Sequence, residues 1–245
     1  MSPFGRTLAD GDRLEIAGAV VRLKVHNRAR RVSLRLDRTK REIVATAPSA
    51  RRLGEAAAFA RDRAQWIADR LSELPQAQAI APGVTIELFG QACRLEVHDK
   101  PARYVPAAAD QPARILARGE GEAYARAVER IIRREALKMF VERTAFHAGR
   151  LGARLPTVTV MDARARWGSC KPGIGLKPPA IRYSWRLALA PFEVADYVVA
   201  HECAHLLELN HGPRFWSHVE TLVGDHRPFR DWLKVEGARL HAFGR

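Results

Sequence analysis

Three histidines and one glutamate in the second half of the chain have the residue types and spacing of a metal-dependent hydrolase. His201, Glu202 and His205 form the string H-E-x-x-H, and His211 follows six residues later. On a helix, positions i and i+4 lie on one face, so both imidazoles can bind one ion with Glu202 beside it. Catalytic zinc takes three protein ligands and keeps a fourth position for water. The spacing therefore predicts a zinc hydrolase in which Glu202 accepts the proton of that water.

The third ligand depends on how the chain turns after this helix. Asn210 suits the left-handed conformation that ends a helix, and Gly212-Pro213 prevents its resumption, so His211 can turn back toward the metal. We favour His211 on this argument. Zinc also accepts carboxylates, and three further residues stay open as alternatives: His218, Glu220 and Asp225.

Other interpretations of the same string are weaker. The histidine spacing equals that of the metzincin proteases, but Glu208 occupies their glycine position, so we do not assign the chain to that class. The string can also be an ordinary polar helix face or a structural metal site, although structural zinc more often uses cysteine. Ser169 and Cys170 are not interpreted as nucleophiles, because no general base can be paired with them from the sequence.

Substrate contacts are expected in two segments, one around Trp167 and one around Tyr183. An extended peptide could lie along an edge strand near Trp167 or residues 181–189, held by main-chain hydrogen bonds. Trp167 could line the groove, although a tryptophan is more often a packing residue. The candidates for stabilising a developing oxyanion are Arg164, Arg166 and Tyr183.

The elements that position these residues follow from the pattern of apolar side chains. The first half alternates apolar and polar residues in short strands, with one amphipathic helix: strands near 14–16, 20–25, 32–36, 43–47, 84–89, 93–97 and 115–116, and a helix at 55–74. The second half is mainly helical, with helices at 120–148, 191–209 and two within 213–241, and strands at 158–160 and 181–189. The pattern predicts an α+β protein with a β-rich N-terminal subdomain, residues 1–118, and a helical domain with a small sheet, residues 119–245.

Composition narrows the class of protein and its partners. The chain of 245 residues is 47% apolar, enough for a sizeable core. Neither a membrane span nor the apolar core of a signal peptide is evident, and three scattered cysteines fit a reducing compartment, so we expect a cytoplasmic protein of unknown oligomeric state. The net charge of +14 favours nucleic acid or nucleotide as a partner, or is simply a solvated basic surface.

Several strings of the second half occur together in one family. The chain resembles the YgjP-like metallopeptidases, which are related to the SprT-like zinc proteases, in these strings: Arg166 to Cys170, Trp185-Arg186-Leu187, Ala190-Pro191, Asp196 to Glu202, Asn210-His211 and Phe215-Trp216. The segment 171–181 is longer than the short hairpin of the family.

The resemblance implies a zincin-like domain of the gluzincin-type minimal protease, in which His201, His205 and His211 bind Zn²⁺ and Glu202 is catalytic. It also implies a peptide or protein substrate. Some members of the family are described as nucleotide pyrophosphatases. A metal-dependent nucleotide pyrophosphatase and a basic nucleic-acid-associated protein with a non-catalytic zinc site are therefore the alternatives.

Overall fold

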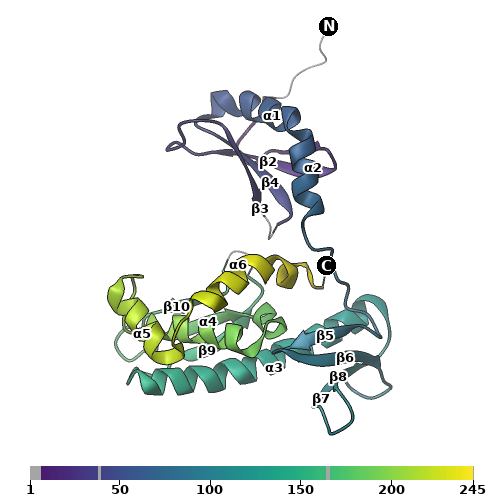
Figure 1. Cartoon of the computed structure of the whole chain (residues 1–245), viewed down its shortest axis with the longest axis vertical. Coiled ribbons are helices and arrows are strands. Elements are labelled where there is room, and N and C mark those ends of the chain that lie inside the picture. The colour runs from purple at the N-terminus through teal and green to yellow at the C-terminus, as the bar shows by residue number, and fades with distance from the viewer. Residues whose placement is uncertain (1–6, 38–39, 164–165, 245) are drawn as a thin grey trace. The chain divides into compact units, whose positions relative to one another are not determined.

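Helices and strands mix along the chain in the computed structural model, which describes residues 7–37, 40–163 and 166–244 (Figure 1). These residues form three small sheets and six α-helices, which confirms the predicted α+β class. None of the helices described is long and apolar enough to cross a membrane. The chain divides into two compact units, Met1–Gln76 and Ala77–Arg245.

The first unit is a four-stranded sheet with two helices packed on it. The strand order is β1-β2-β4-β3, with β1 at Arg13–Ile16, β2 at Ala19–Val25, β3 at Ser33–Asp37 and β4 at Glu42–Ala47. A 3-10 turn, Ala50–Arg52, leads into α1, Leu53–Asp62, and α2, Ala64–Ser72. The helix expected at 55–74 is thus interrupted at Arg63. The apolar side chains of α1 and α2 pack with Val21, Leu23 and Ile43 of the sheet in one core.

The second unit begins with another four-stranded sheet. Its order is β5-β6-β8-β7, with β5 at Thr85–Leu88, β6 at Gln91–Val97, β7 at Arg103–Val105 and β8 at Ala113–Ala117. The sequence placed this sheet in the N-terminal subdomain, with the boundary after residue 118. In the structure, Leu95 and Ile115 of the sheet share a core with Tyr124 and Val128 of the following helix. Alternation within a strand shows which side chains point inward, but not which core they enter.

A long helix and a three-stranded sheet follow. The helix α3, Gly121–Arg150, agrees with the expected helix at 120–148. The sheet has the order β10-β11-β9, with β9 at Thr157–Met161, β10 at Gly168–Lys171 and β11 at Ala180–Ser184. β11 is the central strand, so β10 is an edge, whereas the strand expected at 181–189 stops at Ser184. Residues Trp185–Leu189 form a buried 3-10 helix.

Three helices complete the second unit: α4 at Phe192–Ala204, α5 at Pro213–Val223 and α6 at Arg227–Ala242. The last two confirm the helix pair expected at 213–241. α4 ends five residues before the expected end at 209, because the amide of Leu206 bonds to the carbonyl of Cys203 in a tight turn. Asn210 does not adopt the left-handed conformation proposed for it, since the non-glycine residues with positive φ in the described ranges are Ala17, Arg41 and Phe89.

Candidate metal centre

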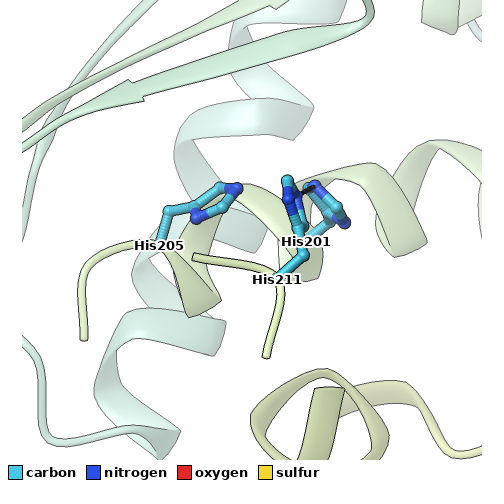
Figure 2. A group of neighbouring side chains, drawn as sticks. All are labelled: His201, His205 and His211. Atoms are coloured by element: carbon cyan, nitrogen blue, oxygen red, sulfur yellow. Dashed lines mark hydrogen bonds between the residues drawn. The ribbon is translucent and has the colours of Figure 1, made fainter. Parts of the chain in front are cut away.

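The imidazoles of His201, His205 and His211 converge at the end of α4 (Figure 2). His201 lies in the last turn of the helix, His205 is the residue that caps it, and His211 lies in the segment before α5. One nitrogen from each ring can be chosen so that all three lie within 4.8 Å of one another. The Nε2 atoms of His201 and His211 are 3.2 Å apart. Two nitrogens bound to one tetrahedral zinc lie about 3.3 Å apart, so the spacing fits a shared ion.

The protonation of the rings also suits a metal. Burial, together with the neighbouring His205, His211 and His226, lowers the pKa of His201 to about 3. Burial likewise lowers the pKa of His205, although the hydrogen bond to Glu208 opposes it. In that bond Nδ1 of His205 donates to the carbonyl of Glu208 at 3.0 Å, because a carbonyl can only accept. The bond orients the ring and leaves the Nε2 lone pair available, as is usual for histidine ligands.

The ring of Phe215 packs against all three imidazoles. Its fully buried ring lies 4.8, 4.5 and 4.6 Å, between ring centroids, from those of His201, His205 and His211. This residue follows His211 by four positions, on the buried side of α5. In the sequence, Phe215 stood out only as part of a family string. The available signal was an apolar residue four positions after His211, in a segment predicted to be helical.

The other candidates for the third ligand do not join the cluster. Among the residues that the structure describes, the group of metal-ligating side chains that converges is His201, His205 and His211. Glu220 instead faces Nδ1 of His226 at 4.0 Å, and Asp225 pairs with Arg227 at 2.8 Å. The geometry therefore favours His211 over His218, Glu220 and Asp225.

Glu202 is buried between α4 and the edge strand β10. Its side chain is only slightly exposed, and within the described chain Oε2 has no hydrogen-bond partner. Burial raises the pKa of Glu202 to about 7, an effect that the positive charge of Arg166 partly offsets. Gly168 makes this packing possible, because a Cβ atom there would lie 2.5 Å from Cγ and 2.6 Å from Cδ of Glu202. Nothing in the sequence indicated this role of Gly168.

An open cavity of about 590 Å³ gives access to the cluster and to Glu202. Arg166 and Trp167, two of the predicted substrate contacts, line this cavity. Trp167 also stacks on His241 of α6, with ring centroids 4.5 Å apart. Tyr183 is placed elsewhere: its side chain is fully buried and its hydroxyl lies 3.0 Å from that of Thr144, so it does not reach the cavity. Arg164 lies outside the described residues.

Ser169 and Cys170 also line the cavity. Burial, with the nearby charge of Glu202, raises the pKa of the Cys170 thiol to about 11. A thiol with this pKa stays protonated near neutral pH, whereas the thiolate is the nucleophile. The structure gives no reason to revise the earlier rejection of a cysteine mechanism.

A charged clamp fixes α4 against α3. Arg143 donates from Nε to Oδ1 of Asp196 at 2.7 Å and from Nη2 to Oδ2 at 3.0 Å. Nε2 of the buried His147 lies 2.9 Å from Oδ1. Burial alone would raise the pKa of Asp196, but hydrogen bonds from His147 and Arg143 outweigh it and lower the pKa. Asp196 lies on α4 upstream of His201, so the clamp holds the helix that carries the first two histidines.

A mixed α+β fold with converging imidazoles beside a buried glutamate defines a candidate metallohydrolase. The comparison with known families agrees: residues 30–236 match the YgjP-like, metallopeptidase domain, and the chain belongs to this family. Membership gives a hydrolase of the metallopeptidase class, with a metal cofactor and a protein or peptide as the class of substrate. No curated protein and no solved structure matched the chain.

Proposed function

We propose that the protein is a zinc-dependent peptidase in which His201, His205 and His211 bind the metal and Glu202 is the general base. The observation that carries the proposal is the convergence of three imidazole nitrogens within 4.8 Å, in a cavity that also contains Glu202. Zinc suits this donor set better than magnesium, which prefers oxygen ligands. The arrangement of a histidine-bearing helix beside an edge strand supports a zincin-like organisation of the second unit.

The chain's own residues supply the proton transfers. Bound zinc contributes Lewis acidity, which lowers the pKa of water and polarises a carbonyl oxygen. Glu202 accepts a proton from the attacking water as the oxygen forms a bond to the carbonyl carbon. It then donates this proton to the amide nitrogen as the carbon–nitrogen bond breaks, so the carboxylate is regenerated. Arg166, which lines the cavity, is the residue we propose to stabilise negative charge on the carbonyl oxygen.

The edge strand β10 offers a place for the peptide backbone. Gly168, Ser169 and Cys170 of this strand line the cavity, and among the described residues β10 pairs with β11 on one side and with no strand on the other. An extended peptide can add to the other side through main-chain hydrogen bonds. The strand β11 is paired on both sides, so the edge expected near residues 181–189 is not available.

The decisive experiment compares wild type with Glu202→Gln. The two proteins are loaded with zinc, analysed for metal, and incubated with an unfolded polypeptide. We expect equal metal content and a fall in cleavage of about 10²- to 10⁴-fold in the variant, the usual contribution of a general base. Full activity of Glu202→Gln would refute the assignment of Glu202.

The same preparations separate the alternative functions. Nucleoside triphosphates are offered with zinc and, separately, with magnesium, and pyrophosphate release is measured. Release of pyrophosphate without cleavage of the polypeptide would replace the peptidase with a nucleotide pyrophosphatase. Zinc binding with neither activity would point to a metal site that is not catalytic.

A further inference from the structure

One wall of the cavity carries positive charge that the catalytic centre does not use. This wall is formed by α6, from which Arg230, Leu233 and Lys234 line the cavity. Arg230 and Lys234 are four residues apart, so they lie on one face of the helix, one turn apart. Arg166, which the proposed mechanism already uses, is a third cation in the lining. Among the described residues of the lining, Glu202 is the one carboxylate.

These cations are weakly neutralised by the protein itself. Among the described residues, neither Arg166 nor Arg230 forms an ion pair, although the charge of Arg166 acts on Glu202 and that of Arg230 acts on Asp231. Arg230 also lies over the ring of Trp216, at 5.9 Å from its centroid. The ammonium of Lys234 is 2.6 Å from Oδ1 of Asp231, but both side chains are mostly exposed, and such a pair contributes little. A cavity lined mainly by positive charge attracts negatively charged ligands.

The general basicity of the chain does not account for this wall. The other arginines of α6 have carboxylate partners: Arg227 pairs with Asp225 at 2.8 Å, and Arg239 pairs with Glu236 at 3.1 Å. Of the three arginines on this helix, Arg230 is the one that forms no ion pair with a carboxylate among the described residues, and it lines the cavity. This placement favours a ligand that brings its own negative charge.

We propose that Arg230 and Lys234 form a subsite for an acidic side chain of the substrate, close to the bond that is cleaved. The inference rests on the proposed peptidase function and adds a substrate class to it. A peptide extended along β10 projects alternate side chains to opposite sides, so one set can reach α6. Leu209 and Leu233, which line the same cavity, provide apolar contacts for the stem of an Asp or Glu side chain.

Binding is measured first, on zinc-loaded Glu202→Gln protein, so that the result does not depend on cleavage. The probes are fluorescent peptides that carry Asp, Gln or Lys at one position and are otherwise identical. Their affinities are measured by fluorescence anisotropy, and the comparison is repeated with the varied residue at each position of the peptide. We expect the Asp peptide to bind about tenfold more tightly than the Lys peptide at one or two neighbouring positions. The preference should shrink in high salt. Reversing both charges, Arg230→Glu with Lys234→Glu, should invert it.

A matched control reverses two exposed cations of α3 that lie outside the cavity, Arg126→Glu with Lys138→Glu, and should retain the wild-type preference. Equal binding of the three peptides would overturn the subsite. Displacement of all three peptides by inorganic triphosphate, with no preference among them, would assign the cations to a phosphate ligand instead. If acidic peptides bind selectively to the zinc-loaded Glu202→Gln protein but zinc-loaded wild type cleaves no peptide, the acidic subsite stands and the peptidase function fails.

Discussion

Replacing Gly168 with alanine should separate catalysis from metal binding. The new Cβ would lie 2.5 Å from Cγ and 2.6 Å from Cδ of Glu202. Carbon atoms in contact are normally about 3.5 to 4.0 Å apart, so either the glutamate or the strand must move by about 1 Å. The histidines lie on other elements and are not displaced directly. The expected result is an enzyme that binds zinc normally but holds its general base in the wrong place.

The magnitude follows from the displacement. A shift of about 1 Å in a catalytic group costs on the order of 10²-fold in rate, so kcat/KM for an unfolded polypeptide should fall about 100-fold. Overpacking at one buried position typically costs about 1 to 3 kcal/mol of stability, which leaves the protein folded at 25 °C if its total stability is typical. The measurements are initial cleavage rates, zinc content by elemental analysis, and thermal unfolding by circular dichroism.

The control for this experiment is Gly149→Ala. Gly149 lies on the exposed side of α3, and a Cβ there would meet nothing within 4 Å. The Gly149→Ala enzyme should therefore be as active as wild type. Introducing Gly168→Ala into the Glu202→Gln variant should cost little further rate, because the displaced carboxylate is already absent. A Gly168→Ala enzyme with the wild-type rate, or one that loses its zinc, would show that Gly168 does not act by positioning Glu202.

Three further predictions test other parts of the structure. His211→Ala should leave the purified protein with well below one equivalent of zinc, whereas His218→Ala should retain it; unchanged zinc in the first variant would exclude His211 as a ligand. Asp196→Ala should lower the free energy of unfolding by about 3 kcal/mol, because it leaves Arg143 and His147 unpaired. The pKa of Asp196 is lowered in the folded state, so this contribution should be complete above about pH 4 and decrease as the pH falls through the folded pKa. Urea unfolding of wild type and Asp196→Ala between pH 2 and 7 measures this contribution. A difference in the free energy of unfolding that stays constant down to pH 2 would contradict the role of Asp196 in the clamp. The last prediction concerns the nucleic-acid partner that the net charge suggests, and it is best tested on the first unit. Residues 1–76 contain 16 Arg and Lys but only 9 Asp and Glu. In this unit Arg31 and Arg63 line a groove together with Phe59 and Trp66. Affinity for single-stranded DNA should fall steeply with salt and with Arg31→Glu combined with Arg63→Glu; affinity unchanged by either would exclude this groove.

The sequence was sufficient for the elements that a regular pattern describes. The spacing of His201 and His205 required one helical face, and α4 provides it. The long helix α3 and the helix pair α5 and α6 were predicted within a few residues, because each has a sustained apolar stripe. The place of His211 in the cluster was anticipated by the break at Gly212-Pro213, although the turn that delivers it begins at His205 rather than at Asn210.

What the sequence could not provide are contacts between residues that are distant along the chain. Arg143 and Asp196 are separated by 53 positions, and neither lies in a motif that indicates an ion pair. In the sequence, Gly168 stood out only as part of a family string, whereas its role depends on the side chain of Glu202 packing against it from another element. Tyr183 lies in a strand near the site, but the pleat directs its side chain into the core rather than into the cavity.

These hidden contacts have a common consequence for the site. The helix that carries His201 and Glu202 is buried along nearly its whole length, so its position is fixed by the residues around it. Asp196 holds it to α3, Gly168 of β10 packs against Glu202, and Phe215 packs against the imidazoles. Burial in this setting raises the pKa of the Glu202 carboxyl, and the three imidazoles converge beside it. The wall formed by α6 is different, because Arg230 and Lys234 lie on its exposed face. Substitutions there should therefore change which peptides bind, whereas substitutions in the buried setting should change whether bound peptides are cleaved.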